Sequence, residues 1–507
     1  MILLILGTIV LLYTVWKEYQ KYKHIPGLFS ILPGLPIKIP ILSPYGFIHA
    51  YDEGPDLIRQ NSVNGIMKLQ RGKRAVVIVS AAELIKEVTI KNHKDFPKPS
   101  EVFKILDLYG PNIVSTNDDV WKNHRAIADP AFAEKHMHFL VSDTVKSTKL
   151  LFKRWNDEGL SKNGRLTTSP DKDMTDVTLD VIGKTNFGYD LEVFNENRSF
   201  DQKKHKMSFF DALTTASTFG LIVAGKTPDF MKPFFTYTNT VGSKNPPAVV
   251  ETRAYMQELI EHRVENYEQA RHDLFSLLVD SNMSQENQDE FRRRLTDQEL
   301  ISDVFIYLLA GHETSTTTLQ WILYELCRNQ HVLDKAIEEV DRVIGDRDVV
   351  FEDYENLSYL KAIMDETLRL HSPVSMVPKV ARRDVTLGGF FVPKGTYVDV
   401  AISTVQTTAQ YFEDPMKWNP ERWTDGKKPV TCSYIPFSFG LRRCIGNTFS
   451  QIETVTILAM ILKDCRIEFP KNDDKMNEII RSGKIDTYTL VTKKPKYIKV
   501  DLVKRNK

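Results

Sequence analysis

One cysteine in the C-terminal third of the chain lies in a short segment rich in glycine and arginine. The segment reads Phe437-Ser438-Phe439-Gly440-Leu441-Arg442-Arg443-Cys444-Ile445-Gly446. Gly440 and Gly446 permit a tight turn and a close approach of the backbone to another group, where a Cβ atom would collide. Backbone N–H groups that follow can point at the sulfur of Cys444 and tune it as a metal ligand. The alternative is that Cys444 is a buried structural thiol, the usual fate of an isolated cysteine.

A second segment that could take part in chemistry lies inside a long apolar helix. Residues 296–299 match a capping box, and an apolar pattern without proline continues to Asn329. At about 1.5 Å per residue such a helix is roughly 50 Å long and must be central. Ala310 and Thr314 face the same side, so the Thr314 hydroxyl can donate to the carbonyl of Ala310 and loosen the helix. The alternative is an ordinary glycine-containing helix with Glu313 at the surface.

Two pairs of residues with helical spacing could form further contacts. Glu366 and Arg369 can form a bidentate ion pair, which Arg422 from a later segment can join. Taken alone, such a pair is usually a surface salt bridge worth a few tenths of a kcal/mol. Trp121 and Arg125 lie on one helix face, and a guanidinium fits a carboxylate well.

The order and spacing of these segments resemble the cytochrome P450 family. The cysteine segment matches the haem-binding pattern F-x-x-G-x-R-x-C-x-G at every fixed position. The other matching segments are Ala310–Thr314 for A-G-x-[DE]-T, Glu366–Arg369 for E-x-x-R, Pro420–Trp423 for P-E-R-F with tryptophan last, and Trp121–Arg125 for W-x-x-x-R. The resemblance extends from the proline-rich N-terminal segment to about Glu453 and includes two departures, Lys379 where the family usually has Arg or His and Ser450 where alanine is commoner.

The resemblance implies a haem b cofactor with the Cys444 thiolate as axial ligand of the iron. A thiolate donates electron density that favours cleavage of the O–O bond of bound oxygen. By the same resemblance, Arg442, Trp121 and Arg125 contact the haem propionates and Phe437 shields the thiolate side of the ring.

Further roles follow from the resemblance for the long helix and for the ion pairs. Ala310 and Gly311 lie against the haem, while Thr314 and Glu313 are the catalytic residues that supply protons during oxygen activation. Glu366, Arg369 and Arg422 form the family's structural triad.

The function implied is a microsomal-type monooxygenase that inserts one atom of O2 into a lipophilic substrate. Hydroxylation or epoxidation of a steroid, fatty acid or xenobiotic is expected, with electrons from NADPH through a separate cytochrome P450 reductase. Cytochrome b5 is a further candidate partner. No glycine-rich nucleotide-binding pattern follows a strand in this chain, so we expect the reductase to bind the NADPH.

Two alternatives to a monooxygenase stay open. One is an enzyme of the same fold that rearranges peroxides or dehydrates its substrate, against which the intact Glu313–Thr314 pair argues. The other is a haem protein without catalysis that senses a ligand.

The residues expected near the substrate and the partner follow from the same resemblance, whereas a membrane-contacting patch is expected where aromatic residues cluster on a loop. The substrate candidates are Val102, Phe103, Leu106, Phe209, Phe210, Leu213, Phe219, Leu221 and Val374–Val377. The reductase candidates are Lys427, Lys428 and Arg443, and Phe230–Phe235 is a candidate membrane-contacting patch. The substrate candidates could equally be core residues, and the reductase candidates could equally be solvated basic residues.

The N-terminus predicts a membrane anchor. Residues 1–16 carry no charge, and Lys17, Lys21 and Lys23 follow. A cleaved signal peptide is the alternative, but no basic region precedes the apolar run. The positive flank predicts a single-pass protein of the endoplasmic reticulum membrane whose catalytic body faces the cytoplasm.

The rest of the chain predicts a mainly α fold with small β-sheets. We expect an anchor over 1–16, a basic and proline-rich tether over 17–44, and one catalytic domain over 45–507, with a β-hairpin over 67–80 and strands within 385–400. The 507 residues carry a net charge of +1, which argues against nucleic-acid binding. Four cysteines are too few for a disulfide framework and indicate a reducing compartment.

Overall fold

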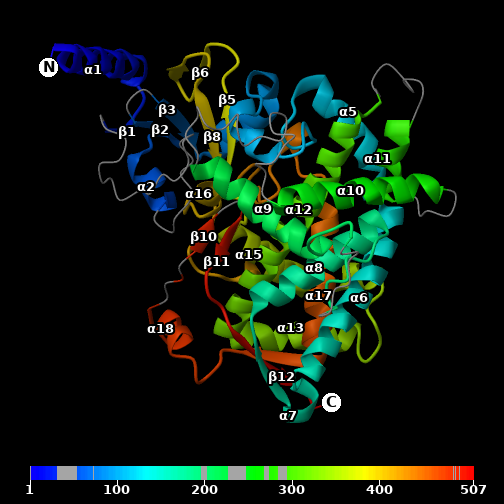
Figure 1. Ribbon diagram of the computed structural model, residues 1–507. Helices are drawn as coiled ribbons and strands as arrows, with labels where there is room; N and C mark the ends of the chain where they lie inside the picture. The colour runs from blue at the N-terminus through cyan, green and yellow to red at the C-terminus, as the bar shows by residue number, and fades with distance from the viewer. Residues whose placement is uncertain are drawn as a thin grey trace. The chain divides into compact units, whose positions relative to one another are not determined.

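The chain folds into two compact units, and many of their helices and strands are labelled in Figure 1. The computed structural model describes residues 2–30, 54–71, 74–195, 203–226, 247–267, 273–283, 294–482, 485, 487–489 and 492–506. The first unit comprises Met1–Phe103, Val374–Lys417 and Lys428–Cys444, and the second comprises Lys104–Pro373, Trp418–Lys427 and Ile445–Lys507.

The first unit is built on a mixed β-sheet. Its helices are α1 (Ile2–Tyr22), α2 (Gly54–Asn61), α3 (Ala82–Lys86), the π-helix η1 (Glu87–Lys91), α4 (Ser100–Phe103), α16 (Ile402–Gln406) and the 3₁₀ turns η2 (His93–Asp95) and η9 (Gly440–Arg442). Its strands are β1 (Gly27–Ser30), β2 (Ile66–Arg71), β3 (Arg74–Val79), β5 (Met376–Val380), β6 (Val385–Leu387), β7 (Phe390–Val392) and β8 (Tyr397–Ala401).

The strand order in the larger sheet is β1-β2-β3-β8-β5, and β6 pairs with β7. The antiparallel β2–β3 pair confirms the hairpin predicted over 67–80. Alternate side chains of β3 enter two separate cores, with Val77 and Val79 on one face of the sheet and Val76 and Ile78 on the other. This sheet is therefore apolar on both faces.

Helix α1 continues beyond the predicted anchor. It reaches Tyr22, whose carbonyl accepts a hydrogen bond from the buried Lys68 Nζ at 2.5 Å. Over the part of the chain that the structure describes, no helix is both long and apolar enough to cross a membrane. The prediction of a transmembrane segment over 1–16 is therefore unsupported; at about 1.5 Å per residue its uncharged run spans roughly 24 Å, less than a hydrocarbon core of about 30 Å.

The predicted tether also differs from the structure in part. Gly27–Ser30 forms β1, which pairs in parallel with β2, although the surrounding prolines argue against a strand. Prolines beside this strand are tolerated because β1 lies at the edge of the sheet, where one side needs no partner strand. Residues 31–44 of the tether and the predicted patch Phe230–Phe235 lie outside the described residues.

The second unit is mainly helical, which confirms the predicted fold class. Its helices are η3 (Lys104–Leu106), α5 (Asp118–Ala128), η4 (Asp129–Phe132), α6 (Glu134–Asp157), α7 (Leu160–Asn163), α8 (Pro170–Phe187), α9 (Phe209–Lys226), α10 (Pro247–Glu265), α11 (Leu274–Met283), α12 (Asp297–Arg328), α13 (Gln330–Val343), α14 (Asp353–Asn356), α15 (Ser358–Leu370), η8 (Pro420–Trp423), α17 (Asn447–Asp464) and α18 (Asp474–Ser482). Its strands are β4 (Arg165–Thr168), β9 (Cys465–Glu468), β10 (Thr487–Thr489), β11 (Lys493–Pro495) and β12 (Val500–Lys504).

Helix α12 is the central helix of this unit. It is 32 residues long and begins with the predicted capping box, in which Thr296 accepts from the Glu299 N–H and Glu299 accepts from the Thr296 N–H. It packs against α8, α15 and α17, as Figure 1 allows the reader to follow. The helix that carries the predicted catalytic residues is thus held on several sides.

Candidate functional site

Cys444 closes a tight turn in the first unit. Its backbone N–H donates to the Phe437 carbonyl at 2.9 Å, and the Arg443 N–H donates to the Gly440 carbonyl at 3.1 Å. Ser438 and Gly440 both have positive φ values, 61° and 74°. Cys444 is exposed, whereas the other three cysteines are buried. The turn therefore presents the Cys444 thiol and speaks against the interpretation of a buried structural thiol.

The two glycines of this segment have different surroundings. A Cβ atom on Gly440 would lie 2.3 Å from the Thr89 carbonyl oxygen of η1, so both its φ and its packing require glycine. A Cβ atom on Gly446 would meet Phe132 at 4.0 Å, an ordinary contact. Packing within the described protein therefore explains glycine at position 440 and leaves space beside position 446.

Three cationic side chains gather near the Cys444 turn. Burial lowers the pKa of Lys379 to about 8, and the charge of Arg442 contributes. The pKa of Lys98 falls well below its usual range for the same reason, with the charges of Arg442 and Lys379 adding to the effect and Cys444 opposing it. Like charges held together away from water are costly unless an anion joins them. This cluster therefore fits an anionic group, such as carboxylates.

In the second unit, α12 becomes accessible at the predicted catalytic segment. Every residue from Glu299 to Cys327 is buried except Ala310, Gly311, Glu313 and Thr314. The Thr314 hydroxyl donates to the Ala310 carbonyl at 3.0 Å, as predicted. An accessible stretch in the middle of a buried helix marks a place where another group can approach it.

Gly311 and Glu313 of this helix contact different parts of the unit. A Cβ atom on Gly311 would lie 2.7 Å from the Ile182 side chain of α8, so this glycine serves helix packing. The Glu313 carboxylate accepts a hydrogen bond from Thr492 Oγ1 at 3.5 Å and lies 3.6 Å from Lys494 Nζ. Lys494 Nζ also lies 3.6 Å from the exposed Asp171. Glu313 is thus linked to the surface through Lys494.

Helix α5 carries the other two residues predicted to bind carboxylates. Trp121 is buried, with 6% of its surface exposed. Arg125 Nε donates to Asp129 Oδ1 at 2.5 Å, so its guanidinium already has a carboxylate partner on the following turn. The sequence alone does not reveal this pairing, because Asp129 lies beyond the matched motif.

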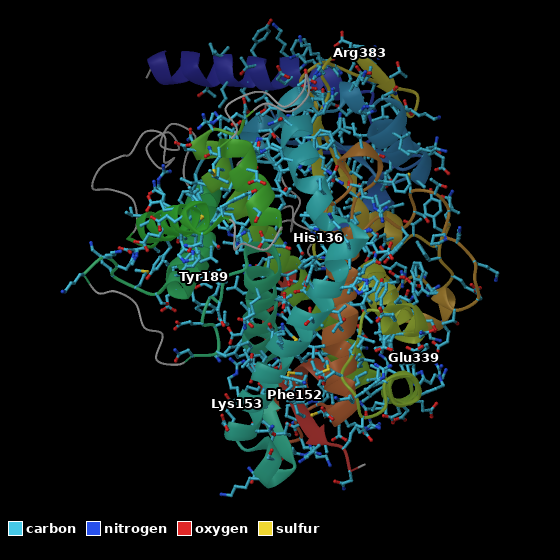
Figure 2. The ribbon with its side chains drawn as sticks, turned by 90° about the vertical axis from the view of Figure 1, so that its right-hand side faces the viewer. His136, Phe152, Lys153, Tyr189, Glu339 and Arg383 are labelled. Atoms are coloured by element: carbon cyan, nitrogen blue, oxygen red, sulfur yellow. The ribbon has the colours of Figure 1, made fainter. Side chains whose placement is uncertain are left out.

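The predicted triad is brought together in the second unit. Glu366 and Arg369 are completely buried, and Arg369 donates from Nε and Nη2 to the two carboxylate oxygens of Glu366, both at 2.8 Å. Arg422 Nε donates to the same carboxylate at 3.1 Å. At the start of α15, Glu339 of α13, labelled in Figure 2, accepts from the Tyr359 N–H at 2.8 Å. The helix that carries Glu366 and Arg369 is therefore fixed at its N-terminus.

A sequence model of the cytochrome P450 family matches residues 33–500 of this chain. The chain belongs to the cytochrome P450 family. Known relatives of this P450 are cytochromes P450 that match most of its length. Cytochrome P450 monooxygenase 124 of Postia placenta is 31% identical over 83% of this chain and 81% of the relative. Cytochrome P450 3A9 of Rattus norvegicus is 26% identical over 91% of this chain and 90% of the relative.

The fold of this P450 also resembles a solved structure. The crystal structure of the cytochrome P450DA heme domain matches it with a TM-score of 0.75 and 24% sequence identity, over 94% of this chain and 99% of that one. At that identity the likeness shows the fold alone. The family model and the relatives show that this chain is a cytochrome P450 monooxygenase.

Family membership implies a haem-thiolate cofactor, and the residues of this P450 fit that group. The accessible thiol of Cys444 can serve as a ligand of the iron. The two haem propionates would form ion pairs with Lys98, Lys379 and Arg442. Lys98 was not found from the sequence. The only local signal is a lysine between two prolines, which no family pattern marks.

The departure at position 423 of this P450 has a physical reason. Where the family has phenylalanine, the Trp423 indole N–H donates to Glu366 Oε2 at 2.9 Å. The Asn419 N–H donates to the other oxygen, Oε1, at 2.9 Å. The buried Glu366 carboxylate thus receives two more donors than the triad alone supplies, and one of them exists only because residue 423 is tryptophan.

Proposed function

We propose that this chain is a haem-thiolate monooxygenase that inserts one oxygen atom of O2 into a lipophilic organic substrate. The observation that carries the proposal is the accessible Cys444 thiol, held in a turn that only glycine at position 440 permits, beside a cluster of cations. When bound, the thiolate-ligated haem supplies the activation of dioxygen.

The residues that would hold the haem come from the contacts described above. Cys444 would ligate the iron, and Arg442, Lys98 and Lys379 would bind propionate oxygens. Trp121 and Arg125 are further propionate donors, and Arg125 would then share its guanidinium between a propionate and Asp129. Phe437 shields the sulfur, and Ala310 provides a small side chain where α12 is exposed.

Proton supply falls to Thr314 and Glu313. The Thr314 hydroxyl donates to the Ala310 carbonyl, and by rotating about χ1 it can donate to a substrate-side acceptor instead. Glu313 is 18% exposed and pairs with Lys494, which in turn lies near the exposed Asp171. This sequence of polar groups offers a path for protons from solvent to the side chain next to Thr314.

Electrons would come from NADPH through a separate cytochrome P450 reductase, with cytochrome b5 as a second candidate donor. The exposed side chains of Lys427, Lys428 and Arg443 support docking to an acidic partner. Lys427 Nζ lies 3.0 Å from Asp425, so Lys428 is a stronger candidate than Lys427.

Attachment to the endoplasmic reticulum membrane, with the catalytic body in the cytoplasm, is part of the proposal. It rests on six apolar or aromatic side chains of α1 that are each more than half exposed, Ile9, Val10, Leu11, Leu12, Tyr13 and Trp16. Apolar surface of this extent is costly in water and favourable in lipid.

The substrate proposed is a lipophilic molecule such as a steroid, fatty acid or xenobiotic. Of the candidate contacts, Val102, Phe209 and Leu213 are buried, and the side chains of Phe219 and Leu221 lie outside the described residues. Burial of apolar side chains suits both a core and a lipophilic pocket, so the class rests on the apolar character of these segments.

The proposal is tested with ¹⁸O2 and a purified reductase. A monooxygenase transfers one ¹⁸O atom to product and consumes NADPH in proportion, and Thr314→Ala should keep NADPH consumption while product falls. A peroxide-rearranging enzyme would turn over without NADPH, and a sensor would yield no product from steroid, fatty-acid and xenobiotic panels. Either result would contradict the proposal.

A further inference from the structure

A histidine lies between two carboxylates inside the second unit. His124 of α5 places Nδ1 2.5 Å from Asp303 Oδ2 and Nε2 3.6 Å from Glu299 Oε1. His124 and Asp303 are completely buried, and Glu299 is 6% exposed. Charged groups are tolerated at such depth only when they are paired. The cluster is therefore an interaction that the fold depends on, and no sequence motif of the family contains all of it.

The same carboxylates hold other segments of the unit. Asp303 Oδ1 accepts from the Ile113 N–H at 2.9 Å, in the loop before α5. Glu299 Oε2 accepts from the Thr296 N–H in the capping box of α12 at 3.0 Å. His124 therefore joins α5 to the beginning of α12 at the point where α12 also fixes the preceding loop.

The charge state of His124 follows from its neighbours. Burial alone would lower its pKa, but the charge and hydrogen bond of Asp303 and the charge of Glu299 outweigh burial and raise the pKa to about 9. The other charged groups on or against α5 have partners of their own. These are Lys122 with Asp119 and Asp118, Arg125 with Asp129, and Asp280 of α11 with Tyr267. At neutral pH the imidazole is thus an imidazolium that faces two carboxylates.

We propose that His124, Asp303 and Glu299 form an ion-pair latch that positions α5 against α12. His124 lies on the same helix as Trp121 and Arg125, one turn from the first and adjacent in sequence to the second. It therefore fixes the helix that presents both side chains. The latch stands on its own contacts, while its consequence for haem binding rests on the proposed function.

The first test measures hydrogen exchange of peptides that cover Asp118–Ala128 at pH 7. His124→Gln and Asp303→Asn each leave a buried partner without its ion pair, so we expect these amides to exchange at least roughly tenfold faster. The double variant removes both charged partners. Its amides should exchange more slowly than the added effects of the two single substitutions predict. The control is His205→Gln, because His205 also lies between two carboxylates, at 2.9 and 3.1 Å, but contacts α10.

Additive effects of the two substitutions, or equal loosening of α5 in His205→Gln, would contradict the latch. Apo-protein serves if a variant loads no haem, because the exchange of α5 is read in either form.

A second readout separates positioning from general stability. Transfer of haem from the full-length protein to apomyoglobin should accelerate as the pH rises through about 9 in the wild type. His124→Gln should release haem rapidly at neutral pH and lose the part of the rise near pH 9, keeping only the part that follows deprotonation of the propionate-binding Lys379, whose pKa is about 8. A wild-type profile in His124→Gln would overturn the inference. A wild type without the reduced-CO band of a thiolate-ligated haem would instead count against the proposed function, and the exchange test of the latch would still stand.

Discussion

At the scale of single residues, the cysteine turn depends on the absence of a side chain at Gly440. Its φ of 74° is unfavourable for other residues, and the Thr89 carbonyl oxygen lies where a Cβ atom would be. The motif predicts glycine here, but the sequence does not show that the contact is with the π-helix η1. That partner emerges only when Glu87–Lys91 and Gly440–Arg442 are seen side by side.

We expect Gly440→Ala to destabilise the protein by about 2 kcal/mol or more, because backbone strain and a steric overlap with Thr89 add. Gly389→Ala is the matched control, since Gly389 has a φ of 84° and no atom within 4 Å of its Cβ position. It should cost about 1 kcal/mol from strain alone. Chemical denaturation measures both, and equal losses would contradict the packing argument.

A second residue-scale prediction concerns Trp423. Its indole N–H donates to the buried Glu366 carboxylate, so Trp423→Phe leaves a charged acceptor with one donor fewer. Hydrogen bonds to charged groups are worth about 1.5–3 kcal/mol.

The matched control is Trp418→Phe, which removes an indole N–H from the neutral Thr367 hydroxyl at 3.1 Å and should cost about 1 kcal/mol. Thermal unfolding of the two variants tests the ranking. A larger loss in Trp418→Phe would show that the charge of Glu366 does not decide the effect.

At the scale of elements, α12 was the most predictable part of the fold. A capping box, an apolar pattern without proline and the Ala310–Thr314 spacing indicated its beginning, its length and its exposed face. The ion-pair partners of neighbouring helices were not predictable. The Arg125–Asp129 and His124–Asp303 pairs depend on how α5 turns about its axis, which a motif on one helix face does not fix.

The capping box itself can be tested. Thr296→Ala removes the hydroxyl that accepts from the Glu299 N–H and should cost about 1 kcal/mol. Ser169→Ala is the control, since Ser169 occupies the N-cap of α8 without a side-chain capping bond and should change stability little. The comparison uses the free energy of unfolding, and a loss in Ser169→Ala as large as that in Thr296→Ala would speak against the role of the cap.

At the scale of the whole molecule, the fold class and the family follow from the sequence, whereas the membrane anchor does not receive support from the structure. Short apolar runs are the weak point of such a prediction, because residues 1–16 are slightly too few to span a bilayer and α1 continues into charged residues. The cluster of Lys98 with Lys379 and Arg442 was also beyond prediction, since distant parts of the chain supply it.

The pH dependence of stability is a property of the whole fold in which Glu453 should stand out. It is completely buried on α17, and burial raises its pKa to about 8 while Ser315 opposes the rise. The unfolded state loses the proton near pH 4.5, so stability falls as the pH rises from there to about 8.

Because glutamine does not ionise, the free energy of unfolding of Glu453→Gln should rise relative to that of the wild type as the pH increases over this range. The difference between variant and wild type should be a few kcal/mol larger at pH 9 than at pH 4.5. Urea denaturation at both pH values measures the difference. A constant difference between variant and wild type across the range would mean that Glu453 ionises alike in the folded and unfolded protein.

The central claim is that the Cys444 thiolate ligates a haem iron, and the absorbance of the reduced protein with carbon monoxide tests it most directly. The account predicts a band near 450 nm, characteristic of thiolate ligation, in the wild type and in the control Cys465→Ala, whose thiol is buried. It predicts loss of that band in Cys444→Ala. A band that survives in Cys444→Ala, or none in a haem-loaded wild type, would contradict the account.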